Sequence, residues 1–505
     1  MSTTETILAQ INQKLGQQPL FFIAPETERG MGLEKLLENY FVIAANADAT
    51  SAWLEGLLKG KLIKESGGST KLLANQEFQA FVQSKFTKDA FRLNNSSRKI
   101  NLQFFKSTSD ESVPILTQAG IIPTVLNNSA ELTRQLENKV KQYQILLNSP
   151  VVDHLPESQI IALQDFDETK FKSVFKSSGL ALQLPFGHTG SSTYLIDDTE
   201  KGRQNLTELQ AIRQSFPKRV ARIVRKIEGL PLTINACNYG ESTFSGGLSY
   251  QYTGIAQLTA LSSATVGNDW SLPKEFITEQ LRGEIADLAQ LIGQVLHKQF
   301  NFRGLFGLDL IWEVETNKLY LIEINPRQTA SIPMHTKLQL EAGQIPLSVL
   351  HLAEFLRLDL QELKINSQDY SLEALQPFAA SQVFLRSQSR QSFAVPASKL
   401  NPGVYRQQSD SAAREAIAAG RGDDVIYLDA DEDRPIIRQG EGYSLDDFST
   451  DGFLLLIKPT GTTIEFNEEM ARLKIRQSLG MYTAGRVQLL PLAQDALQKI
   501  GSVLS

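Results

Sequence analysis

The sequence predicts an α/β protein that is α+β in part, and three observations support this fold class. Short apolar runs alternate with amphipathic segments over residues 1–137. A long amphipathic segment at 272–299 precedes two strand patterns within 304–327. Short strands punctuated by glycine and proline dominate from residue 358. The 505 residues suffice for about three domains.

Residues 1–137 predict a doubly wound α/β domain. The apolar runs expected to form its strands are 19–24, 40–45, 113–116 and 121–125. The segment 32–39 is expected to be helical. No G-x-G-x-x-G follows the first strand, so a dinucleotide site is not supported.

Helices are predicted at 138–147 and 167–178, followed by a strand at 180–184. The next segment, Pro185–Thr193, is rich in glycine and hydroxyl side chains. Such a loop can fold over phosphates because its backbone N–H groups are unobstructed, although a plain β-turn explains the glycines equally well. Its spacing is not that of a Walker A loop.

A strand is then predicted from Arg219 to a turn at Gly229, and another at 232–236. Arg222 and Arg225 have a simple interpretation as residues that solvate a strand face. The segment 272–299 predicts a long helix with one apolar stripe.

The segment Gly304–Arg327 predicts two strands joined by a short polar turn at 315–318. On the second strand, Glu323, Asn325 and Arg327 recur with period two. All three side chains therefore point to one face.

The length of the turn decides whether Asp309, on the first strand, joins that face. A two-residue loop places Asp309 opposite Ile324, whereas a three-residue loop places it opposite Glu323 or Asn325. We therefore expect a loop of odd length.

One wall would thus carry two carboxylates, an amide oxygen and a guanidinium, a set that suits the binding of a metal and a phosphate. Hard oxygen ligands suit Mg²⁺, and an arginine beside the metal can stabilise charge on a transferring phosphoryl group. The alternative is a solvated hairpin end. However, the neighbouring Leu308, Leu310, Ile322 and Ile324 are typical of a strand core.

The strings Gly304-x-x-Gly307-x-Asp309 and Leu321-Ile-Glu-Ile-Asn-Pro-Arg327 resemble the metal-binding end of the ATP-grasp superfamily, of the carboxylate–amine ligase type. The resemblance implies a Rossmann-like domain at 1–137, an ATP-grasp domain of two subdomains at 138–357 and a β-rich α+β domain at 358–505. It implies Asp309, Glu323 and Asn325 as ligands of Mg²⁺, with Mn²⁺ as an alternative. Arg327 would face the transferred phosphoryl group as the catalytic residue.

The resemblance also implies how ATP is held: by a lysine from the first helix, by the glycine-rich loop and by an adenine hinge between two strands. The implied ATP-binding residues are Lys139, Gln183, Gly187, Gly190, Ser191, Ser192, Thr193, Arg225, Lys226 and Ile227. The alternative interpretation of Lys139 is a helix lysine that faces solvent. Gln183 stands where many members carry a lysine, and it supplies no charge.

From residue 358 the sequence predicts short strands at 381–386, 424–428 and 453–458. Helices are predicted at 465–479 and 492–503, the second with Pro491 at its start.

Composition excludes several classes of protein. The net charge of −6 and the lack of a Lys/Arg block argue against nucleic-acid binding. No apolar run approaches the roughly 20 residues that span a bilayer. The single cysteine excludes an intrachain disulfide, and no signal-peptide pattern is present. A cytoplasmic protein is therefore expected.

We expect a ligase that uses ATP and Mg²⁺ to form an acyl-phosphate on a carboxylate and joins it to an amine, releasing ADP and phosphate. The expected partners are small-molecule or peptide acids and amines and, as is common in the family, a second copy in a homodimer. Two alternatives remain: an ATP-grasp enzyme with another acceptor, such as a carboxylase or thiol ligase, and a degenerate nucleotide-binding module, which Gln183 favours.

Overall fold

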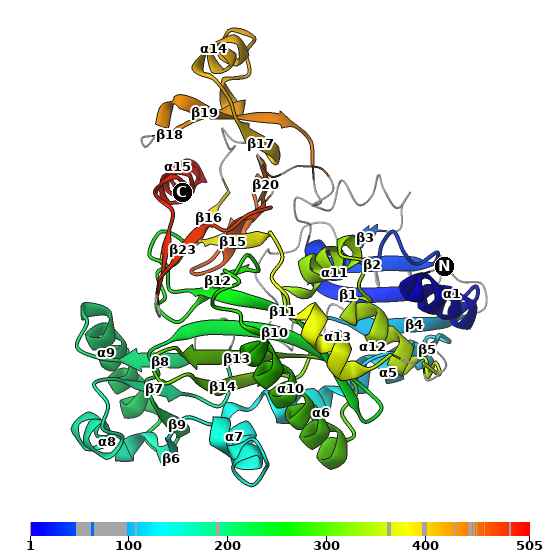
Figure 1. Ribbon diagram of the computed structural model, residues 1–505, viewed down its shortest axis with the longest axis vertical. Helices are drawn as coiled ribbons and strands as arrows, with labels where there is room; N and C mark the ends of the chain where they lie inside the picture. The colour runs from blue at the N-terminus through cyan, green and yellow to red at the C-terminus, as the bar shows by residue number, and fades with distance from the viewer. Residues whose placement is uncertain are drawn as a thin grey trace.

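The computed structural model describes most of the chain. The described residues are 2–46, 62–64, 98–106, 109–187, 192–360, 365–395, 401–428, 431–442, 447, 450, 452–458, 460–483 and 486–504. A large sheet crosses the middle of the molecule, and a five-stranded and a four-stranded sheet lie beside it (Figure 1). No helix within the described ranges is long and apolar enough to cross a membrane.

The N-terminal sheet has five parallel strands in the order β3-β2-β1-β4-β5. They are β1 (Leu20–Glu26), β2 (Tyr40–Asn46), β3 (Leu62–Lys64), β4 (Lys99–Phe104) and β5 (Ile122–Val125). The short helix η1 (Thr27–Gly30) follows β1, and helices α1 (Thr3–Leu15) and α5 (Ser109–Gln118) accompany the sheet. Phe22 and Ile23 lie in two different cores, so β1 is buried on both faces as a doubly wound sheet requires.

Three predicted strands of this region are confirmed, and two other expectations are wrong. Residues 113–116 lie inside α5, because so short an apolar run cannot distinguish a strand from a buried helix face. The segment 32–39 forms turns instead of a helix. Gly32 has a φ of 112°, which no helical residue adopts. The strand β4 was not predicted.

A small antiparallel sheet of order β6-β9-β7-β8 follows the predicted helix at 138–147. Its strands are β6 (Ser158–Ala162), β7 (Leu180–Gln183), β8 (Thr193–Ile196) and β9 (Val220–Arg225). The helices of this region are α6 (Ala130–Glu137), α7 (Lys139–Leu147), α8 (Glu168–Val174) and α9 (Glu200–Ser215), with η2 (Val152–His154) and η3 (Leu163–Asp165). These elements confirm the helices and strands predicted between 138 and 225.

The large sheet has eleven strands in the order β14-β13-β10-β11-β12-β15-β22-β20-β17-β19-β18. Its first half is β10 (Leu230–Tyr239), β11 (Ser242–Thr253), β12 (Thr265–Asp269), β13 (Gly304–Glu313) and β14 (Lys318–Asn325). The predicted long helix is α10 (Glu279–Phe300), and it packs with α12 (Leu347–Phe355) and α13 (Ser367–Ala374) on one face of this half, while α11 (Ile332–Glu341) follows β14 (Figure 1). On β13, Leu308 joins the core beneath α10.

The C-terminal strands extend the same sheet, because β15 pairs with β12. They are β15 (Ser381–Arg386), β17 (Gly403–Gln407), β18 (Val425–Leu428), β19 (Asp431–Gly440), β20 (Gly452–Ile457) and β22 (Glu469–Ile475). The remaining elements are β16 (Phe393–Ala394), β21 (Thr463–Ile464), β23 (Gly480–Thr483), β24 (Arg486–Leu489), α14 (Asp410–Ala418), η5 (Gly422–Asp424) and α15 (Pro491–Leu504).

The predicted helix at 465–479 is wrong, because this segment contains β22. Leu473 and Ile475 enter one hydrophobic core, whereas Arg472 and Lys474, which alternate with them along the strand, contact acidic side chains. This alternation has period two and is that of a strand. The strands predicted at 381–386, 424–428 and 453–458 and the helix at 492–503 are confirmed.

Candidate active site

A cavity of about 600 Å³ lies between the small sheet and the first half of the large sheet. Side chains of β7, β8 and β9 line one wall. Side chains of β10, β11, β13 and β14 line the other. All the predicted site residues that the structure describes, except Ser192, line this cavity.

The wall built by β13 and β14 carries the predicted metal ligands. Asp309 lies directly opposite Glu323, as expected. The predicted odd-length loop is wrong, however, because the residues between the paired strands are 314–317, an even number. A β-bulge leaves Ile322 without a residue opposite it, and this extra residue shifts the register by one. The bulge, and not the loop length, therefore brings Asp309 opposite Glu323.

The carboxylates of Asp309 and Glu323 are held by neutral amides and one cation. The Nδ2 of Asn325 donates to Asp309 Oδ2 at 3.0 Å, and the Nε2 of Gln251 donates to Asp309 Oδ1 at 3.2 Å. Glu323 forms an ion pair with Lys139. Burial, and then the charge of Glu323, raise the pKa of Asp309 to about 6.

This donor set fits a divalent cation such as Mg²⁺. Two carboxylates on paired strands repel each other, and the ammonium of Lys139 already occupies a cation position beside Glu323. The described residues contain no group of three or more His, Cys, Asp and Glu side chains that could hold a metal. A site of two carboxylates and one amide oxygen suits Mg²⁺, which takes its further oxygens from phosphates and water.

Both glycines of the G-x-x-G-x-D string have a structural reason. Gly304 has a φ of 71°, and a Cβ there would collide with His351. A Cβ on Gly307 would collide with the Cγ2 of Thr329. Gly307 thus lets the segment after β14 pack directly against β13.

Lys139 reaches the metal wall because α7 docks on β14. Asn138 caps the helix by accepting from the N–H groups of Val140 and Lys141. The Gln142 side chain exchanges two hydrogen bonds with the backbone of Ile324, at 2.6 Å and 3.0 Å, as a neighbouring strand would. Lys139 is 6% exposed, so the alternative of a solvent-facing lysine is wrong.

The glycine-rich loop forms the connection between β7 and β8. Gln183 pairs with Thr193, and both line the cavity together with Gly187. Ser192 is buried, and its backbone oxygen accepts from Leu184 at 2.9 Å. Gly190 and Ser191 lie outside the described residues.

Arg222 is a cavity residue whose importance was not predicted from the sequence. It lies beside Gln183 in the small sheet and donates to its Oε1 at 3.3 Å. It is 4% exposed, so its interpretation as a residue that solvates a strand face is wrong. Its guanidinium lies 4.5 Å from the ring centroid of Tyr143. Burial lowers the pKa of Arg222 to about 10, so it remains a cation and supplies the charge that Gln183 lacks.

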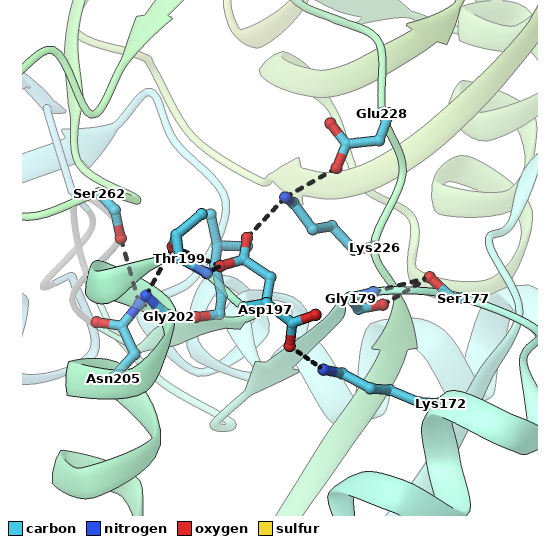
Figure 2. Close-up of polar contacts among 12 residues, drawn as sticks. Lys172, Ser177, Gly179, Asp197, Thr199, Gly202, Asn205, Lys226, Glu228 and Ser262 are labelled. Carbon is cyan, nitrogen blue, oxygen red and sulfur yellow. Dashed lines mark hydrogen bonds and ion pairs between the residues drawn. The ribbon is translucent and has the colours of Figure 1, made fainter.

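The predicted hinge, Arg225–Ile227, connects β9 to β10 and lines the cavity. Arg225 donates to Glu313 at 3.3 Å and to the hydroxyl of Tyr320 at 2.7 Å. Lys226 contacts both Asp197 and Glu228 (Figure 2). Its ammonium lies 2.8 Å from each carboxylate. The charges of both side chains are thus paired within the protein. The backbone N–H groups of Arg225 and Lys226 also donate within the protein, to the carbonyl oxygens of Glu157 at 2.9 Å and Gly179 at 3.1 Å.

Arg327 follows β14 and is held by a carboxylate that sequence reasoning missed. Its Nε donates to Glu137 Oε1 at 3.0 Å, and Lys106 lies 2.7 Å from the other oxygen of Glu137. Arg327 also lies 5.7 Å from the ring centroid of Phe105. Lys106 follows β4 and Glu137 ends α6, so no local pattern could have connected them with the hairpin.

The comparisons with known proteins concern the fold. No protein-family model and no curated protein sequence matches the chain. Among solved structures, pyruvate carboxylase of Rhizobium etli is 14% identical over 91% of this chain and 36% of its own, with a TM-score of 0.52. Biotin carboxylase of Campylobacter jejuni is 10% identical over 90% and 86%, with a TM-score of 0.50. An L-amino acid ligase of Bacillus licheniformis is 11% identical over 91% and 93%, with a TM-score of 0.49. The pyruvate carboxylase and the biotin carboxylase are ATP-grasp enzymes, and this chain shares the ATP-grasp fold with them.

Proposed function

We propose that this protein is a ligase that depends on ATP and Mg²⁺. A carboxylate oxygen of the substrate attacks the γ-phosphorus of ATP and releases ADP. An amine then attacks the acyl carbon, loses a proton and displaces phosphate, which leaves an amide. The observation that supports this proposal best is the gathering of Asp309, Glu323, Asn325 and Arg327 on one wall of a cavity between two sheets.

The nucleotide would lie along the cavity between the hinge and the metal wall. The backbone of Arg225–Ile227 would contact the adenine, with Leu310 and Ile322 supplying apolar surface. Lys139 and Arg222 lie beside the metal wall and would contact the phosphates, because Lys139 is paired with Glu323 and Nη1 of Arg222 donates to the carbonyl oxygen of Ile322 at 3.5 Å.

Asp309, Glu323 and Asn325 would hold Mg²⁺, or Mn²⁺ in its place, and the bound metal would neutralise charge on phosphate oxygens. Arg327 would stabilise the phosphoryl group as it passes to the acid. Glu137 orients Arg327 through the 3.0 Å contact with its Nε. Nη1 donates to the carbonyl oxygen of Gln328 at 3.2 Å and Nη2 donates to Asn325 Oδ1 at 3.4 Å, so the guanidinium lies against the metal wall.

The first test is the thermal stability of the full chain with Mg²⁺ and ATP, ADP or GTP. A nucleotide at about 100 times its Kd should add about 2.7 kcal/mol to the free energy of unfolding. Glu323→Gln should lose most of this stabilisation, because it removes one of the two carboxylates. Glu315→Gln should retain it, because Glu315 is an exposed residue on the same hairpin.

The catalytic part of the proposal needs a product assay. Wild type should release ADP in the presence of Mg²⁺ and a suitable acid and amine, and Arg327→Met should bind ATP but turn over far more slowly. A Glu323→Gln variant as active as wild type would contradict the proposed metal site. Stabilisation by ATP without ADP release from any acid and amine would favour nucleotide binding alone.

A further inference from the structure

The end of the cavity beyond the metal wall carries an excess of positive charge. We call it the cationic end; it consists of Lys106, Arg134, Glu137 and Arg327, all of which line the cavity. Glu137 contacts both Lys106 and Arg327. Three cations face a single carboxylate, so two positive charges are left without a counterion.

Of these cations, Arg134 has the fewest contacts with opposite charge within the part of the chain that the structure describes. It lies one turn before Glu137 on α6, so both residues share one face of the helix. It is exposed at the cavity, and within the described ranges it forms no ion pair. Lys106 lies 2.7 Å from Glu137, the residue that shares this helix face with Arg134, so the two cations lie on the same side of α6.

The nucleotide end of the same cavity is balanced. Asp309 and Glu323 oppose Lys139 and Arg222 there, while Arg225 is paired with Glu313. A nucleotide at the metal wall would be separated from Lys106 and Arg134 by Arg327, whose Nη2 contacts Asn325 at 3.4 Å and whose Nε contacts Glu137 at 3.0 Å. The bound nucleotide therefore does not account for the excess at the cationic end.

The reacting carboxylate of the acid brings only one negative charge. We propose that the acid substrate carries a second anionic group, either a carboxylate or a phosphate, and that Lys106 and Arg134 bind it. Arg327 then remains available for the phosphoryl group, and Glu137 keeps it separate from Lys106. This inference rests on the proposed function and names the class of its acid: a dianion.

Lys106 follows β4 of the N-terminal sheet, whereas Arg327 follows β14 of the large sheet. The dianion would therefore bind between the two sheets, in contact with both. Lys106 and Glu137 are largely buried, with side chains 16% and 13% exposed, so a bound anion would be partly shielded from water. Charge-assisted hydrogen bonds are strong in such a place.

The test uses the full chain with Mg²⁺ and a non-hydrolysable ATP analogue at saturation, so that the phosphate-binding end is filled. Butyrate, succinate and inorganic phosphate are added at equal ionic strength, above the second pKa of phosphate. We expect succinate or phosphate to raise the thermal stability more than butyrate. The better of the two identifies the second group as a carboxylate or a phosphate.

Lys106→Met and Arg134→Met should each weaken the binding of the preferred dianion about tenfold, the loss of one charge-assisted hydrogen bond. Both should retain the stabilisation by the nucleotide. Lys141→Met removes an exposed lysine near the cavity and should bind the dianion as wild type does. Because Arg134 is exposed, Arg134→Met is expected to fold even if Lys106→Met does not.

Equal effects of butyrate and the dianions, no effect of any of the three, or dianion binding unchanged in the variants would each overturn the inference. These results would leave the proposed function intact as long as the nucleotide still stabilises wild type. A nucleotide that stabilises nothing would instead contradict the proposed function itself.

Discussion

Two groups of charged side chains join the N-terminal sheet to the rest of the molecule, and they differ in a way that separates architecture from function. One is the cationic end of the cavity. The other, which we call the buried charge cluster, consists of Glu26, Glu28, Lys458, Arg472 and Lys474. It joins the end of β1 and η1 to β22 and the residue after β20.

In the buried charge cluster, opposite charges are paired. Lys458 lies 2.9 Å from Glu26, Lys474 is paired with Glu28, and Arg472 lies 3.4 Å from Glu28 and 2.9 Å from Glu469. None of these residues lines the cavity. A buried charge with a fixed partner holds elements together, whereas an unbalanced charge that faces a cavity indicates a ligand.

The largest effect should come from breaking the buried charge cluster. Lys474→Met leaves Glu28 buried with one partner fewer, and such a change costs about 3–5 kcal/mol. Unfolding in urea would measure this loss. The variant that still folds should bind the nucleotide as wild type does, because Lys474 lies outside the cavity.

The same variant has an expected pH dependence. Burial alone would raise the pKa of Glu28, but the charges of Lys474 and Arg472 outweigh burial and lower it below 4.5. Glu28 therefore stabilises the folded state above pH 4.5, and this contribution is lost as the pH falls through the lowered value. The difference between wild type and Lys474→Met should shrink in acid. A constant difference would contradict the assigned role of the pair.

A smaller effect is expected at the cationic end. Glu137→Gln leaves Lys106 and Arg327 without their shared carboxylate, but both side chains face the cavity, where water can solvate them. We expect a cost of about 1–2 kcal/mol in urea unfolding. The exposed Glu131 on the same helix supplies the control, Glu131→Gln, with a smaller cost. A loss as large as that of Lys474→Met would mean that Glu137 has a structural role.

The hairpin shows how far the sequence alone can lead. The period-two spacing of Glu323 and Asn325 predicted their shared face, because side-chain alternation is a local property of strands. The pairing of Asp309 with Glu323 was also predicted, but it was attributed to an odd-length loop instead of a β-bulge. A β-bulge at Ile322 has no signature in the alternation of residues. Its extra residue shifts the register by one, so Asp309 pairs with Glu323 although the loop has an even number of residues.

The residues that sequence reasoning missed come from distant segments. Arg222 acquires its role only when β9 pairs with β7 and brings it beside Gln183. Lys106 and Glu137 meet Arg327 only when the N-terminal sheet packs near the hairpin. Each of these side chains finds its partner in a distant segment, so no local sequence pattern could connect them.

The smallest effect should come from a surface ion pair that lies two residues from Lys474. Arg476 contacts Glu341 of α11 with both Nη groups, at 2.9 Å and 2.8 Å, but the two side chains are 21% and 35% exposed. Arg476→Met should cost about 0.5 kcal/mol in urea unfolding, since water and salt already screen the pair. The cost should fall further at high salt, whereas that of Lys474→Met should not. Equal costs for the two variants would show that burial does not distinguish these ion pairs, and the contrast between the buried charge cluster and exposed charges would fail.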